Sequence, residues 1–142
     1  MTTDEPNRPR GFTAIGVFFL FGATMAAYAA VTLLDPNTSL DLLWRLNRTA
    51  RVQLASLGTA AGVGFIVLSG MLLAAGAGWL RRRYWGWVLG AVIVALNAAG
   101  DLVNLVIGEH LKGAIGVAIA GLLLLYITRP RLRNYFAAKS RH

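Results

Sequence analysis

Long apolar runs separated by short polar segments make up most of this chain. Four runs carry at most one charged residue each, and they cover residues 12–34, 57–80, 84–107 and 111–128. A spanning helix needs about 20 mostly apolar residues, because the hydrocarbon core is about 30 Å thick and each residue rises about 1.5 Å. The runs are continuous and do not alternate, which favours helices over barrel strands. The pattern therefore predicts an all-α, transmembrane four-helix bundle that forms a single domain over residues 1–142.

The connection after the first run is long enough to hold structure of its own. Asp35-Pro36-Asn37 ends the first helix, because proline excludes a continuing helix. Apolar residues then recur at helical spacing, and the opposite face carries Arg45, Arg48 and Arg51. This periodicity predicts a short amphipathic helix over residues 39–55, lying on the outer membrane surface in the first extracytoplasmic loop.

Composition identifies lipid as the solvent of the apolar runs. Apolar residues make up 56% of the chain and charged residues 14%, whereas an ordinary soluble domain has about 45–50% and about 25%. A soluble fold of 142 residues cannot bury so much apolar surface. The surplus is therefore expected to face the bilayer.

Basic residues gather at the ends of the apolar runs, and their distribution predicts the orientation. The N-terminal tail, residues 81–83 and the C-terminal tail hold ten of the 14 Lys and Arg residues, and the other side holds four. Positively charged flanks stay in the cytoplasm, so both termini are predicted to be cytoplasmic. The net charge of +8 lies at helix ends and not along one stripe, so it does not indicate a nucleic-acid partner.

The basic segment 129–142 is predicted to be a cytoplasmic tail. Its Leu132, Tyr135 and Phe136 lie among basic residues, which is typical of a weak amphipathic helix. We expect these three side chains to rest on the inner leaflet. Aromatic residues at positions 79–87 mark the same membrane boundary, because Trp and Tyr prefer the headgroup level.

Small residues recur four positions apart in or beside the runs. The pairs are Gly58 with Gly62, Gly86 with Gly90, and Gly116 with Ala120. Small residues at this spacing let helix backbones approach closely, which is how spans associate in lipid. Two interpretations stay open. The pairs pack the four helices on one another, which is favoured because four spans need such faces, or they form a docking face for a second subunit.

The third run carries the most informative polar residues, Asn97, Asp101 and Asn104. Their i, i+4, i+7 spacing places them on one face of a helix. A charged side chain at the centre of a membrane costs at least about 2–3 kcal/mol, so it normally faces protein or water and often has a function. We therefore expect this polar stripe to face away from lipid.

Two hypotheses follow for Asp101. In the favoured one it is a structural anchor that pairs with Arg45, Arg48 or Arg51 of the outer helix, while the asparagines hydrogen-bond to neighbouring spans. In the alternative it binds a proton or a cation in a pathway that the asparagines line. The anchor is favoured because one carboxylate with two amides makes a poor pathway.

Residues suited to catalysis or metal binding are sparse. The sequence has no cysteine and two histidines, His110 and His142, neither of which has a carboxylate pair at ligand spacing. It contains no phosphate loop, nucleophile elbow or zinc motif. We therefore expect no enzyme activity, no metal and no cofactor.

Three stretches resemble a known class of proteins. They are residues 79–90 (WLRRRYWGWVLG), Asn97 to Asn104, and residues 126–136 (YITRPRLRNYF). They resemble uncharacterised small four-span bacterial membrane proteins, in which a basic-aromatic turn precedes the third span and an arginine-proline stop follows the fourth. The resemblance implies a fold and a membrane location but no activity. Small multidrug exporters also have four spans, but they need a carboxylate in the first, and residues 12–34 contain none.

These observations predict a non-catalytic accessory or scaffold subunit of a larger membrane protein assembly in the bacterial inner membrane. Its expected partners are the lipid bilayer and another membrane subunit or a second copy of the chain. The alternative is a small oligomeric ion- or proton-coupled channel or transporter that uses Asp101. The accessory hypothesis rests on the small-residue faces, the short loops and the lack of a catalytic motif in the sequence.

Overall fold

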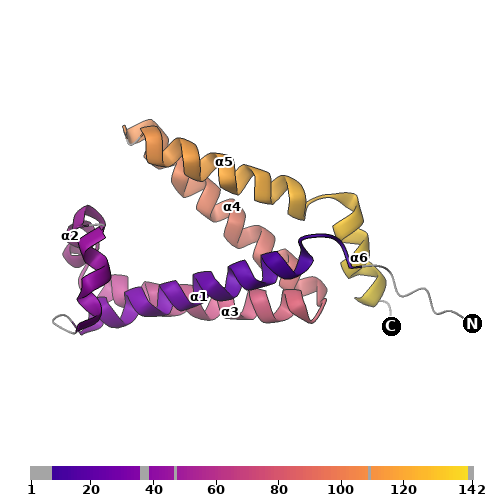
Figure 1. The fold of residues 1–142 in the computed structure, drawn as a ribbon, viewed down its shortest axis with the longest axis horizontal. Coiled ribbons are helices and arrows are strands. Elements are labelled where there is room, and N and C mark those ends of the chain that lie inside the picture. Colours follow the sequence, from indigo (N-terminus) through magenta and orange to yellow (C-terminus); the bar gives the residue numbers. More distant parts are fainter. Residues whose placement is uncertain (1–7, 36–38, 47, 109, 141–142) are drawn as a thin grey trace, which may run out of the picture. The chain divides into compact units, whose positions relative to one another are not determined.

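The helices of the computed structural model follow the apolar runs (Figure 1). The structure describes residues 8–35, 39–46, 48–108 and 110–140. Regular structure in these ranges is helical, and four of the helices are long and apolar enough to cross a membrane: α1 (Phe12–Leu34), α3 (Thr59–Leu80), α4 (Tyr84–Ile107) and α5 (His110–Ile127). The predicted all-α class with four helices of spanning length is therefore confirmed.

Backbone chemistry sets where these helices begin and end. α1 ends at Leu34, just before Asp35-Pro36, because proline cannot continue a helix and disfavours a helical residue before it. Gly58 precedes α3 with a φ of 56°, a left-handed conformation that glycine adopts without strain. This turn places the start of α3 at Thr59, where the sequence led us to expect residue 57.

The described part of the loop between α1 and α3 holds two short helices, where we expected a single one over residues 39–55. η1 is a 3-10 helix over Ser39–Leu46, and α2 is an α-helix over Arg48–Ser56. The indole Nε1 of Trp44 donates to the Thr32 hydroxyl at 2.8 Å, which ties η1 to α1. A 3-10 helix has about three residues per turn, so the α-helical periodicity assumed for this segment does not hold through η1. The interfacial position of the segment stays a prediction.

Residue contacts divide the chain into two units. The central unit is Phe18–Leu73, and the terminal unit combines Met1–Val17 with Ala74–His142. The boundary falls within α1 and within α3, so each of these helices contributes to both units. The expectation of a single domain stays a prediction.

In the central unit, α1 and α3 lie side by side (Figure 1) and meet through small side chains. The α1 face that contains Ala23 and Ala26 is buried. The Ser69 hydroxyl of α3 donates to the Ala23 carbonyl at 2.9 Å, and Gly62 lies against the side chain of Leu34. Small residues and interhelical hydrogen bonds are the contacts that hold spans together in lipid, where no hydrophobic drive acts between helices.

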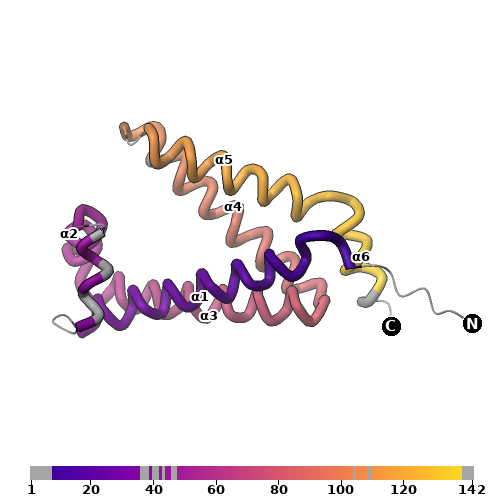
Figure 2. Tube along the Cα trace, in the orientation of Figure 1, coloured from indigo at the N-terminus to yellow at the C-terminus, as the bar shows by residue number. Residues whose placement is uncertain are grey.

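In the terminal unit, α4 and α5 form a helical hairpin in which α5 returns along α4 (Figure 2). The two backbones come close at Gly113, where a Cβ atom would lie 2.6 Å from the backbone nitrogen of Leu105. The α6 helix (Pro130–Ser140) follows α5 after a short turn at Arg129. Proline is tolerated at the first position of α6 because that backbone nitrogen needs no helical partner.

An aromatic cluster joins α6 to the ends of α1 and α3 in the terminal unit. The rings of Phe12 and Trp79 stack at 5.6 Å between centroids, and Phe136 lies 4.9 Å from Trp79. The Trp79 indole also donates to the Phe12 carbonyl at 2.8 Å. Leu132, Tyr135 and Phe136 are consequently buried by protein. They do not rest on the inner leaflet as we expected, because rings from α1 and α3 cover this face of α6.

Candidate functional site

The predicted polar stripe lies on α4, in the terminal unit. The side-chain amide of Asn97 donates to Asp101 Oδ2 at 3.3 Å, one helical turn further along. Asn97 is exposed and Asp101 is partly buried, while the side chain of Asn104 lies outside the described part of the structure. The structure thus brings Asn97 and Asp101 together, and Asn97 is the more exposed residue of this pair.

The carboxyl group of Asp101 lies against the backbone of α5 at Gly116. A Cβ atom on Gly116 would lie 2.5 Å from Asp101 Oδ2 and 2.8 Å from Oδ1, which is closer than Cβ atoms approach other atoms. A side chain at position 116 would therefore force the carboxyl group of Asp101 to move from this position. The one acidic residue of the third apolar run is used in the contact between α4 and α5.

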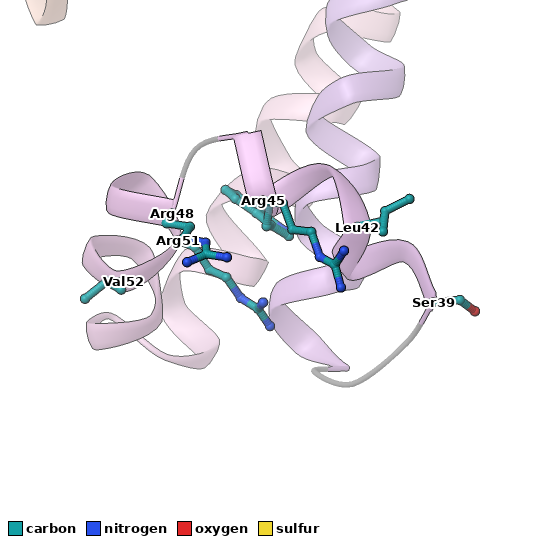
Figure 3. Close-up of a pocket in the computed structure, with 7 residues that line it drawn as sticks. Ser39, Leu42, Arg45, Arg48, Arg51 and Val52 are labelled. Carbon is teal, nitrogen blue, oxygen red and sulfur yellow. The ribbon is translucent and has the colours of Figure 1, made fainter.

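The three arginines proposed as partners of Asp101 lie in the central unit. Arg45 from η1 and Arg48 and Arg51 from α2 gather around one open pocket (Figure 3) of about 560 Å³. The rest of the described lining consists of Ser39, Leu42, Trp44 and Val52. Guanidinium groups collected in one pocket raise the local positive potential and attract anions. Asp101 belongs to the terminal unit, so its pairing with one of these arginines stays a prediction.

Gly86 makes a direct backbone contact across the turn between α3 and α4. A Cβ atom on Gly86 would lie 2.6 Å from the Cα of Gly78, and one on Gly78 would lie 2.8 Å from the Cα of Gly86. The helices touch backbone to backbone here, so neither position has room for a side chain. The sequence pattern paired Gly86 with Gly90 and missed Gly78. The sequence signal for this contact is a glycine on each side of the short basic turn at residues 81–83.

The other predicted packing residues differ in their surroundings. Gly90 and Ala120 are buried, and Gly62 lies against Leu34. Gly58 has no described atom within 4 Å of the place where its Cβ would be, and its φ is positive. Its place in the structure is the turn before α3, where it supplies backbone conformation and no helix contact.

Arg82 ends α3 in a conformation that usually requires glycine. Its φ is 57°, and the Arg83 amide donates to the Gly78 carbonyl at 2.8 Å, the bond that closes a Schellman motif. The guanidinium carbon lies 3.9 Å from the ring centroid of Tyr135. This cation–π contact links the turn to α6. In the sequence, Arg82 stands out only as one of the basic residues that indicate the topology.

Metal-ligating side chains do not gather in the part of the chain that the structure describes: no three of its His, Cys, Asp or Glu residues are placed to hold an ion. The chain was also compared with known proteins. No protein-family model, no curated protein and no solved structure matches it.

Proposed function

We propose that the chain is a multi-pass protein of a bacterial inner membrane, with both termini in the cytoplasm. The four long helices supply the spans, and the distribution of Lys and Arg favours this orientation. The aromatic cluster packs the start of α1 against the end of α3 and against α6. Segments that pack in one cluster lie on one side of the membrane, so the cluster supports an even number of crossings between them. The four-helix bundle, the loop helices on the outer surface and the resemblance to small four-span bacterial proteins belong to the same proposal.

Within this membrane the chain acts as a non-catalytic accessory or scaffold subunit of a larger assembly. The observation that carries this function is the position of Asp101, whose carboxyl group fits against Gly116 and accepts from Asn97. A carboxyl group fitted between two helices serves their packing. Its open side and the exposed Asn97 amide can bond to a polar group of another span. Polar groups in a span are stable only with such a partner or with water.

A second candidate function uses the same two residues. Asn97 is exposed beside the partly buried Asp101, so the pair can line a wet path in an oligomer of this chain. Asp101 would then carry a proton or a cation. Asp101→Asn should abolish transport and leave folding intact, because the amide keeps the shape of the side chain but does not ionise. A folded mutant with unchanged transport would contradict this second function.

The first experiment is purification of the tagged full chain from its native membrane in a gentle detergent, followed by mass spectrometry of the intact complex. We expect a different membrane protein in a fixed ratio to the chain. A complex that contains only copies of this chain would contradict the accessory function and favour the channel or transporter.

A pair of variants then tests whether the polar pair faces the partner. Asn97→Ala removes the exposed amide, and we expect it to lower the ratio of partner to tagged chain. Leu102→Ala is the control, because Leu102 is 52% exposed and lies on another face of α4. Equal partner ratios in both variants and the wild type would show that the partner binds elsewhere.

A further inference from the structure

A second group of arginines surrounds a pocket in the terminal unit, where α5 ends and α6 begins. Its volume is about 930 Å³. The polar residues that line it are Arg8, Arg10, Tyr126, Arg129, Arg131, Asn134 and Tyr135. Pro9, Leu132 and Ala138 supply the apolar part of the wall. We call this the tail pocket.

Specific contacts hold the N-terminal segment at the tail pocket. The Tyr126 hydroxyl donates to the carbonyl of Arg10. Gly11 has a φ of 87°, and a Cβ atom there would lie 3.1 Å from the Tyr126 hydroxyl oxygen, so glycine permits the close approach. The guanidinium carbon of Arg129 lies 5.9 Å from the centroid of the same tyrosine ring. Two segments that are distant in sequence therefore build one site.

Tyr135 brings a buried hydroxyl group without a partner to this wall. The residue is 7% exposed, and its hydroxyl makes no hydrogen bond to any residue that the structure describes. Its ring contacts the Arg82 guanidinium at 3.9 Å and packs against the Phe12 ring in a T-shaped arrangement, with 5.5 Å between centroids. Buried hydroxyl groups are normally satisfied by protein, by water or by a ligand. The tyrosine oxygen itself has almost no accessible surface, so a ligand in the tail pocket meets the rest of this residue and not its hydroxyl group.

The charge of the tail pocket selects the chemistry of the ligand. Four of its described lining residues are arginines and none is acidic. Asp101 is the one carboxyl side chain in the described part of the terminal unit, and it lies against Gly116 on α5, away from this lining. The planar guanidinium group matches the paired oxygens of phosphate and carboxylate anions, so an arginine cluster favours these two classes of ligand.

We propose that the tail pocket binds a phosphate ester anion, and specifically the headgroup of an anionic phospholipid. The pocket lies at the end of α5, which is the headgroup level if α5 is a span. Pockets of about 300–1,000 Å³ hold whole small molecules, so this volume exceeds that of inorganic phosphate and leaves room for a glycerol ester. The inference rests on the proposed membrane location and not on the accessory function.

The test measures binding of phosphatidylglycerol to the full chain in phosphatidylcholine nanodiscs. Arg10→Gln with Arg131→Gln removes two charges from the pocket wall. Arg81→Gln with Arg133→Gln is the matched control, because both arginines are exposed and neither is among the lining residues. Each pair loses the same general attraction to an anionic surface. We expect the pocket pair to bind at least about tenfold more weakly than the control pair. Equal affinities would overturn the proposal.

Soluble competitors identify the source of the phosphate. Inorganic phosphate and glycerol 3-phosphate are added at millimolar concentration to the wild type and to the pocket pair. Lipid that stays bound identifies a headgroup site, and displacement by either competitor identifies a site for a free phosphate ester. Equal affinities of the pocket pair and the control pair for every probe would overturn the proposed phosphate site. A wrong orientation in the membrane would appear in topology labelling and would leave the lipid preference unchanged.

Discussion

At the scale of single residues, Arg82 shows how one side chain serves two purposes. Its left-handed backbone costs roughly 1–2 kcal/mol relative to an ordinary conformation. Its guanidinium stacks on Tyr135 at 3.9 Å, a contact worth about 0.5–2 kcal/mol. The two terms are of similar size, so the contact with α6 offsets the strain of the turn.

Substitution at Arg82 separates these terms. Arg82→Ala loses the stacking and keeps the strain, whereas Arg82→Gly loses the stacking and relieves the strain. We expect the glycine variant to be more stable than the alanine variant by about 1 kcal/mol, measured by thermal unfolding in detergent. Arg83→Ala is the control, because Arg83 is exposed. Equal stability of the two Arg82 variants would contradict the assigned backbone strain.

At the scale of elements, the hairpin of α4 and α5 depends on two glycines of α5 that are one turn apart. Gly113 meets the backbone of Leu105, and Gly116 meets the carboxyl group of Asp101. The predicted pair on this helix was Gly116 with Ala120, and Ala120 is indeed buried at 3% exposure. The close contact between α4 and α5 therefore begins at Gly113, nearer the start of α5 than the predicted pair of Gly116 and Ala120.

Two glycine-to-alanine changes on α5 should have opposite effects. Gly113→Ala forces a methyl group onto the Leu105 backbone, and overpacking of this kind costs about 1–3 kcal/mol. Gly121→Ala meets no described atom within 4 Å, so it should be neutral or stabilising by up to about 1 kcal/mol through helix propensity. Thermal unfolding of both variants in one detergent provides the comparison. A Gly113→Ala protein as stable as the wild type would contradict the close approach.

At the scale of the whole molecule, the terminal unit unites both ends of the chain. Residues 8–17 and α6 share the aromatic cluster and the tail pocket with the end of α3. The terminal unit thus contains all three basic segments: the N-terminal tail, residues 81–83 and the C-terminal tail. A positively charged face of this kind is what the positive-inside rule assigns to the cytoplasm.

Cysteine labelling tests this orientation cleanly, because the natural sequence has no cysteine. Ser39→Cys and Asn134→Cys each place one thiol at an exposed position. We expect a membrane-impermeant maleimide to label the first in intact cells and the second only after the membrane is opened. The reverse pattern would show that the termini lie outside, and labelling of both in intact cells would contradict an odd number of crossings between them.

The sequence by itself determined which segments are helices. The predicted runs 12–34 and 84–107 coincide with α1 and α4. The run 57–80 begins two residues before α3, and the run 111–128 differs from α5 by one residue at each end. Helix length and apolar content are local properties, so they can be counted along the chain. The spacing of Asn97 and Asp101 is equally local, and it placed both on one face of α4.

Only the tertiary structure decided what each face touches. Three features depend on how separate helices pack: the pairing of Gly86 with Gly78, the position of Asp101 on Gly116, and the cover of Phe12 and Trp79 over α6. Apolar and small residues suit lipid and protein contacts alike, because lipid tails are as apolar as protein side chains. Hydropathy therefore finds a span, and only the packed neighbours show which of its sides is covered.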